Sequence, residues 1–168
     1  MRLGLIVNPI AGIGGRVGLK GSDGAEVQQS ALALGAQPQA HLRAELALQA
    51  LIPLRDTLEL VTPPGAMGES VACKCGFNPT VIAAQAPGPT SAEDTIHAAR
   101  QMRALPVDLI LFAGGDGTAR DLYNAVGANF PVLGIPAGVK IYSAVFATHV
   151  RHAGELAAAY LRGERVHL

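Results

Sequence analysis

An excess of basic charge is missing from this sequence of 168 residues, in which 13 Lys and Arg side chains balance 13 Asp and Glu. Proteins that bind nucleic acids usually concentrate basic side chains on one face. Aromatic residues are also scarce, with four Phe, three Tyr and no Trp, too few for a base-stacking platform. Both shortages argue against a nucleic-acid partner.

Long apolar runs and a cysteine framework are absent as well. No apolar run approaches the about 18 residues that indicate a membrane-spanning helix. Residues 1–8 contain one basic residue and no small-residue cleavage site, so they predict a strand rather than a signal peptide. Two cysteines do not make a disulfide framework. We therefore predict a soluble, cytoplasmic protein without a membrane partner.

Small residues are what the sequence has in quantity. It contains 20 Gly and many Ala, and 49% of its residues are hydrophobic, which suffices for the core of one domain. The Gly and the 11 Pro are too many for a helical bundle and too scattered for collagen or a disordered tail. A core of small side chains suits closely stacked layers of helices and strands.

Short apolar runs alternate with helical stretches along the chain. Strands are predicted at residues 2–7, 58–61, 80–83, 107–113 and 131–135, and helices at 23–34, 40–51, 95–105, 118–126 and 153–161. Ser91 to Asp94 predicts an N-terminal helix cap, and residues 166–168 look like the start of a further strand. The strands are continuously apolar rather than alternating, which favours a parallel sheet with both faces buried. The sequence thus predicts an α/β fold.

The sharpest motif is GGDGT at residues 114–118, directly after the strand predicted at 107–113. Ligands of open parallel sheets bind beyond the carboxyl ends of the strands. Glycines let a phosphate approach the backbone, and the amides that begin the next helix attract anions. Asp116 could then orient Mg²⁺ or accept a proton from an attacking hydroxyl. The alternative is a tight turn in which Asp116 or Thr118 only caps the helix.

A second glycine-rich segment, NPIAGIGG at residues 8–15, follows the first strand. It is not a dinucleotide fingerprint, because the third glycine comes one position late, at Gly18. It is not a Walker loop either, because Lys20 follows Leu19 and precedes Gly21. The segment is either a phosphate cradle or a simple turn.

A third segment, GIPAGVKIYS at residues 134–143, again leads from a strand into a Gly/Pro turn. Lys140 could neutralise a phosphate and Ser143 could hydrogen-bond one. Lys140 could equally be a surface residue after a turn.

Metal ligands are not indicated. Cys73 and Cys75 lack a second pair and a nearby His, so we predict free thiols. His149 and His152 share a helix face without an acidic partner at ligand spacing, which favours solvated or capping side chains.

Four segments in order resemble one family: NPIAGIGGRVGLKGSDG, PGAMGES, FAGGDGTARD and GIPAGVKIYSAVFAT. They are similar to the NAD kinase and diacylglycerol kinase superfamily, and more narrowly to the predicted ATP-NAD kinase branch that includes the acetoin-catabolism X proteins. The resemblance implies a three-layer, Rossmann-like or flavodoxin-like parallel sheet with helices on both faces. It also implies that residues 1–168 form the N-terminal kinase domain. Members of the superfamily carry a β-rich acceptor domain that this sequence does not reach, so we expect a fragment or truncated chain, inactive alone.

The resemblance also implies roles for particular residues. Asp116 would be the catalytic acid/base or the carboxylate beside Mg²⁺. The nucleotide phosphates would be bound by residues of the three glycine-containing segments: Asn8, Gly12, Gly14, Gly15, Gly114, Gly115, Gly117, Thr118, Lys140 and Ser143.

The phosphate donor implied by the family is ATP or polyphosphate, with Mg²⁺, and the acceptor is a hydroxyl compound. NAD is one candidate acceptor, although this chain has Pro136-Ala137-Gly138 where NAD kinases show Asn-x-Gly. The alternative is a non-catalytic nucleotide-binding or accessory module. An exposed strand edge near Val166 and Ala-rich surfaces lead us to expect a homo-oligomer.

Overall fold

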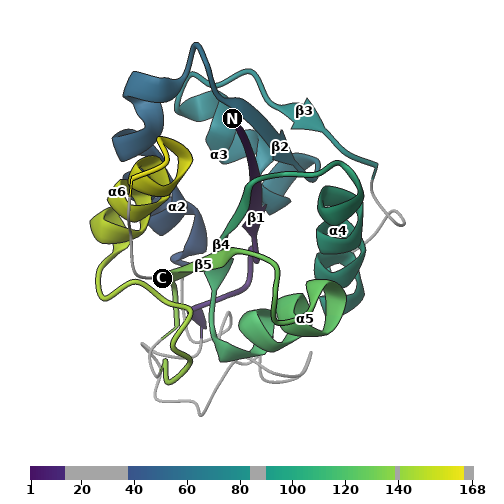
Figure 1. The fold of residues 1–168 in the computed structure, drawn as a ribbon. Coiled ribbons are helices and arrows are strands. Elements are labelled where there is room, and N and C mark those ends of the chain that lie inside the picture. The colour runs from purple at the N-terminus through teal and green to yellow at the C-terminus, as the bar shows by residue number, and fades with distance from the viewer. Residues whose placement is uncertain (14–37, 84–89, 139–140, 165–168) are drawn as a thin grey trace.

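The sheet is parallel throughout and has five strands. The computed structural model describes residues 1–13, 38–83, 90–138 and 141–164 (Figure 1). The strands are β1 (Arg2–Val7), β2 (Glu59–Thr62), β3 (Thr80–Val81), β4 (Leu109–Gly114) and β5 (Val132–Pro136), in the order β3-β2-β1-β4-β5. All five predicted strands are confirmed, each shifted or shortened by two residues at most.

Among the described residues, four α-helices lie between successive strands: α2 (Ala40–Leu48), α3 (Glu69–Lys74), α4 (Ala92–Ala104) and α5 (Asp116–Val126). A further helix, α6 (Val150–Leu161), follows β5. Two 3₁₀ turns, Gln49–Leu54 and Gly65–Met67, precede β2 and α3. The predicted cap of α4 is confirmed, because the Asp94 carboxylate accepts hydrogen bonds from the backbone N–H and the hydroxyl of Ser91. The helix predicted at 23–34 and the strand predicted at 166–168 lie outside the described residues.

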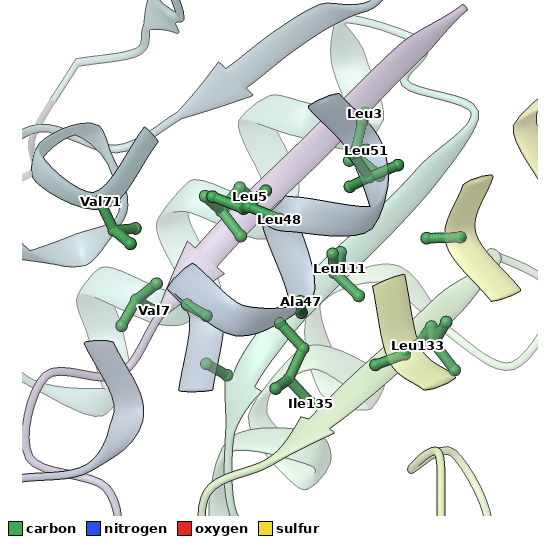
Figure 2. Close-up of a cluster of buried hydrophobic side chains, with 14 of the residues drawn as sticks. Leu3, Leu5, Val7, Ala47, Leu48, Leu51, Val71, Leu111, Leu133 and Ile135 are labelled. Carbon is green, nitrogen blue, oxygen red and sulfur yellow. The ribbon is translucent and has the colours of Figure 1, made fainter. Parts of the chain in front are cut away.

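Helices cover both faces of the sheet, so the predicted three-layer α/β fold is confirmed. Figure 1 shows α2 and α6 on one face and α4 and α5 on the other. Side chains of β1 alternate between the two cores: Leu5 and Val7 pack beneath α2, whereas Ile6 packs toward α4 and α5. Figure 2 shows Leu5 and Val7 of β1 in one buried cluster with Leu48 of α2 and Leu111 of β4. Burial on both faces explains why the strands are continuously apolar.

Small residues bring the layers close together. A Cβ on Gly154 of α6 would overlap the backbone carbonyl of Ala47 in α2. Likewise, a Cβ on Gly134 of β5 would overlap the ring of Phe146, which packs edge-on against Phe112 with ring centroids 5.2 Å apart. At these two positions glycine is needed because the backbone lies directly against another segment of the chain.

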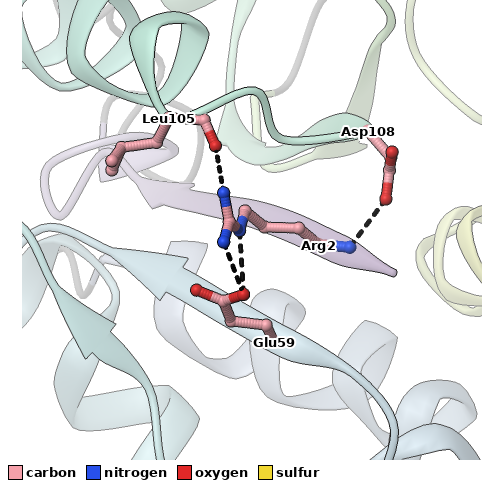
Figure 3. Close-up of polar contacts among 4 residues, drawn as sticks. All are labelled: Arg2, Glu59, Leu105 and Asp108. Atoms are coloured by element: carbon pink, nitrogen blue, oxygen red, sulfur yellow. Dashed lines mark hydrogen bonds and ion pairs between the residues drawn. The ribbon is translucent and has the colours of Figure 1, made fainter.

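A polar network fastens the amino-terminal edge of the sheet (Figure 3). The Arg2 guanidinium donates to the Glu59 carboxylate, with Nε 2.9 Å and Nη2 2.8 Å from Oε2, and also donates to the Leu105 carbonyl. The backbone N–H of Arg2 donates to Asp108 Oδ2 at 2.7 Å. Arg2 thus joins β1 to β2 and to the residues between α4 and β4, at the edge opposite the glycine-rich loops.

The α2–α6 contact yields a stability prediction. Gly154→Ala should lower the free energy of unfolding by about 1–3 kcal/mol, because the added methyl group cannot fit against the Ala47 carbonyl without moving a helix. Urea denaturation measures this loss. Glu155→Ala is the matched control, because it places the same residue in the same helix turn, where the Glu155 side chain is 64% exposed. Equal stability of the two variants would contradict the proposed crowding.

Candidate functional site

The glycine-containing segments meet at the carboxyl edge of the sheet. Because every strand is parallel, the segments after β1, β4 and β5 all begin at this edge, and β4 lies between β1 and β5. β1 lies between β2 and β4 in the sheet. The chain runs from β1 to β2 on one side, and β4 is added later on the opposite side of β1. Ligands of open α/β sheets bind at such a switch point.

Asn8 links the first two segments. Its backbone N–H donates to the Ala113 carbonyl at 2.9 Å, and its side-chain Nδ2 donates to Thr118 Oγ1 at 3.0 Å. Asn8 Oδ1 also accepts the N–H of Ile10 at 3.2 Å. Thr118 is buried, so its hydroxyl binds Asn8 at a place closed to solvent. Asn8 and Thr118 therefore hold the β1 and β4 segments together.

Gly12 links the first segment to the third. Its φ of 84° lies in the left-handed region, and a Cβ there would also overlap the carbonyl oxygen of Ala137. Both features require glycine. Gly14, Gly15 and Lys140, which were predicted to bind phosphate, lie outside the described residues.

Gly114 and Gly115 are glycines for different reasons. A Cβ on Gly114 would lie 2.6 Å from Cβ and Oγ1 of Thr118, so packing alone requires glycine there. Gly115 has an ordinary extended φ of −119°, and a Cβ on it would meet nothing nearer than Gly138 Cα at 4.0 Å. Neither conformation nor packing within the described chain requires glycine at position 115. Among the described residues, the space beside the Gly115 backbone is therefore open.

Asp116 joins the second segment to the third. Its Oδ2 accepts the backbone N–H of Tyr142 at 3.0 Å, and its Oδ1 accepts that of Ser143 at 3.1 Å. Ser143 therefore reaches the predicted site through its backbone N–H. The Asp116 side chain remains partly exposed, and a carboxylate oxygen has lone pairs for more than one partner.

The N-cap residue of α5 supplies no side-chain cap. The helix begins at Asp116, two residues earlier than predicted, and its N-cap residue Gly115 has no side chain to cap it. The first backbone hydrogen bond of the helix runs from Ala119 N to the Gly115 carbonyl at 3.1 Å. The amides of Asp116, Gly117 and Thr118 precede it and have no partner within the helix. Neither Asp116 nor Thr118 is the N-cap, so the alternative in which one of them caps α5 is wrong.

The chain as a whole matches a known family. Residues 3–165 match the family described as the ATP-NAD kinase N-terminal domain. The chain belongs to this family. The predicted NAD kinase-like family is thereby confirmed, while the narrower acetoin-catabolism branch stays a prediction.

Solved structures with a similar arrangement include two from Bacillus anthracis strain Sterne. Both are described as diacylglycerol kinases, one of them provisionally. Each is 17% identical to this kinase-family chain, with TM-scores of 0.46 and 0.43. The matches cover 95% of this chain and 42% of each of those chains. A comparison with curated proteins finds no match.

Two residues at this edge were not predicted from the sequence. Arg43 of α2 donates a hydrogen bond from Nη1 to the Pro136 carbonyl at 2.6 Å. Among the described residues, Arg43 forms none of the ion pairs. Tyr142 is 83% exposed beside Asp116. No local signal marks Arg43, because it lies 93 residues before its partner. Tyr142 lies in the third segment, for which the sequence predicted Lys140 and Ser143 as the phosphate-binding residues.

Metal-ligand clusters and membrane-spanning helices are not found in the described parts of the chain. Within those parts, no group of three His, Cys, Asp or Glu could hold a metal ion, and no helix is long and apolar enough to cross a membrane. Cys73 and Cys75 are free thiols, as predicted. Burial, followed by the nearby Glu45 charge, raises the pKa of the Cys75 thiol.

The contrast between the two glycines can be tested by stability. Gly114→Ala should lower the free energy of unfolding by about 1–3 kcal/mol, because its methyl group would displace the Thr118 side chain. Gly115→Ala should change it by less than about 0.5 kcal/mol. Urea denaturation of both variants checks the pair. A large loss in Gly115→Ala would mean that folding, not a ligand, requires that glycine.

Proposed function

We propose that this chain is the phosphate-binding domain of a kinase that transfers a phosphoryl group from ATP or polyphosphate to a hydroxyl group of a small acceptor. The observation that carries the proposal is the Gly115 backbone, which the described residues leave open, directly before the first amides of α5 and beside a partly exposed carboxylate. Membership in the ATP-NAD kinase N-terminal domain family supports it.

The start of α5 supplies the groups that would hold the phosphates. Free amides at a helix N-terminus favour negative charge, and a residue without Cβ lets a phosphate oxygen reach them. Gly115, Gly117 and the backbone of Thr118 would make these contacts. The Arg43 guanidinium, which donates to a neutral carbonyl, would add positive charge at the same edge.

The other predicted phosphate-binding residues act by holding the segments in place. Asn8 and Thr118 join the β1 and β4 segments through their side chains, and Gly12 lets the first segment lie against Ala137. Gly114 makes room for the Thr118 side chain. Their substitution would disturb the geometry of the phosphate site rather than remove a contact to phosphate.

Asp116 fits Mg²⁺ in its donor chemistry, because Mg²⁺ is commonly bound by one or two carboxylates together with substrate phosphates and water. Bound Mg²⁺ would neutralise charge on the donor phosphates during transfer. Asp116 could also accept the proton of the acceptor hydroxyl. Its two backbone hydrogen bonds hold the carboxylate in one orientation for either role.

We propose that the acceptor is bound mainly by residues outside these 168, in a β-rich domain of the kind that the family resemblance implies. NAD stays one candidate acceptor.

A second candidate function is a nucleotide-binding accessory module that transfers nothing. The observation that favours it is that both carboxylate oxygens of Asp116 already accept backbone hydrogen bonds, at 3.0 and 3.1 Å. If the only role of this carboxylate is to hold the backbone of residues 142–143, a protein that catalyses no reaction would need it as well.

Ligand binding gives the first test. Mg²⁺–ATP should raise the melting temperature of the chain, because a ligand bound only by the folded state stabilises it. In Gly115→Ala the added methyl group should weaken ATP binding at least about tenfold, or about 1.4 kcal/mol, while the free energy of unfolding without ligand stays unchanged. Thermal shift titrations measure both. An unchanged melting temperature with millimolar ATP and with tripolyphosphate would exclude a phosphate site at α5.

Phosphoryl transfer in the intact gene product separates the two candidate functions. Asp116→Asn should reduce transfer to the accepted hydroxyl compound at least about 100-fold, since a positioned general base contributes at least that much. ATP binding without Mg²⁺ should change little, which controls for an intact fold. Full transfer by the variant, or no transfer by the unaltered protein to NAD or lipid acceptors, would favour the accessory module.

A further inference from the structure

Tyr142 is an aromatic residue that the fold does not use. Among the described residues it is the most exposed large hydrophobic side chain, at 83%. By contrast, Phe112 and Phe146 pack against each other in the core, and Tyr160 packs against the core of the α2 face. The chain has only seven aromatic residues. Exposing one of them to water stabilises nothing in the folded chain.

The backbone of Tyr142 is nevertheless held in place. Its N–H donates to Asp116 Oδ2 at 3.0 Å, and the next residue, Ser143, donates to Oδ1 at 3.1 Å. Asp116 itself directly follows Gly115, the position where the backbone is open to a ligand. An exposed aromatic ring is therefore attached at a fixed point beside the start of α5.

An aromatic ring at this point can make one kind of contact that the phosphate-binding residues cannot make, which is stacking on a base. Every nucleic-acid base has a π-face that stacks on an aromatic side chain, and such stacking needs no hydrogen-bond pattern. Fixing the backbone beforehand reduces the entropy lost when the ring is ordered on a ligand.

We propose that Tyr142 stacks on the base of a nucleotide whose phosphates bind at the start of α5. The inference rests on the proposed function and deepens it, because it selects a nucleoside triphosphate over polyphosphate as the donor. Polyphosphate has no base and gains nothing from Tyr142.

The test compares one ligand that has a base with one that lacks it. Mg²⁺–ATP and Mg²⁺–tripolyphosphate are titrated against the unaltered chain and against Tyr142→Ala, Tyr142→Leu and Tyr142→Phe. The Ala and Leu variants should bind ATP about tenfold more weakly, within the range measured for base–aromatic stacking, and tripolyphosphate unchanged. The Phe variant should bind both ligands like the unaltered chain.

Tyr123→Ala is the matched control. Tyr123 is also a tyrosine whose side chain is exposed, at 60%, but it lies about two turns after the start of α5. It should leave both affinities unchanged. Urea denaturation should show equal stability for all the Tyr142 variants, since the replaced side chain is mostly in water.

Three results would overturn the inference. Equal weakening of ATP and tripolyphosphate in Tyr142→Ala would mean that Tyr142 only supports the segment that Asp116 holds. Unchanged ATP binding in both the Ala and Leu variants would mean that the ring does not contact the base; in either case the proposed phosphate site stands. Binding of neither ligand by the unaltered chain would overturn the proposed function and the inference together.

Discussion

Close approach of one backbone to another is the constraint on which this structure depends. α6 can lie against α2 only because Gly154 has no side chain at the Ala47 carbonyl. The same constraint recurs at the carboxyl edge, where Gly12 lies against the Ala137 carbonyl and Gly114 against the Thr118 side chain. The absence of a Cβ at these glycines thus allows close contacts both between the layers and between the segments at the carboxyl edge.

We propose that the residues at the carboxyl edge divide into those that position the segments and those that face a ligand. Asn8, Gly12 and Gly114 have partners inside the protein that account for their identity. Gly115 has none among the described residues, and Asp116 has partners but keeps an exposed surface. Motif matching treats these residues alike, although loss of a positioning residue would first change the shape of the site.

The sequence predicted the strands and the meeting of the three segments because both follow from local patterns. β1 is a continuous apolar run, and parallel strands bring their carboxyl ends to one edge. α3 was missed because six residues are too few to show a helical period. The role of Arg43 could not be foreseen, because its partner lies 93 residues away and the contact depends on where α2 packs. The different reasons for Gly114 and Gly115 depend on where the Thr118 side chain lies, which no spacing specifies.

The hydrogen bonds of Asp116 have a thermodynamic consequence. The same two oxygens that would face a cation or a proton also fix the backbone of Tyr142 and Ser143. A ligand that withdraws electron density from the Asp116 carboxylate weakens its hydrogen bonds to the two amides. By linkage, a partner that draws the Tyr142 and Ser143 backbone away changes the affinity of the carboxylate for that ligand by the same factor. If a ligand binds at the start of α5 as we propose, its binding and the hydrogen bonds to Tyr142 and Ser143 are therefore coupled equilibria.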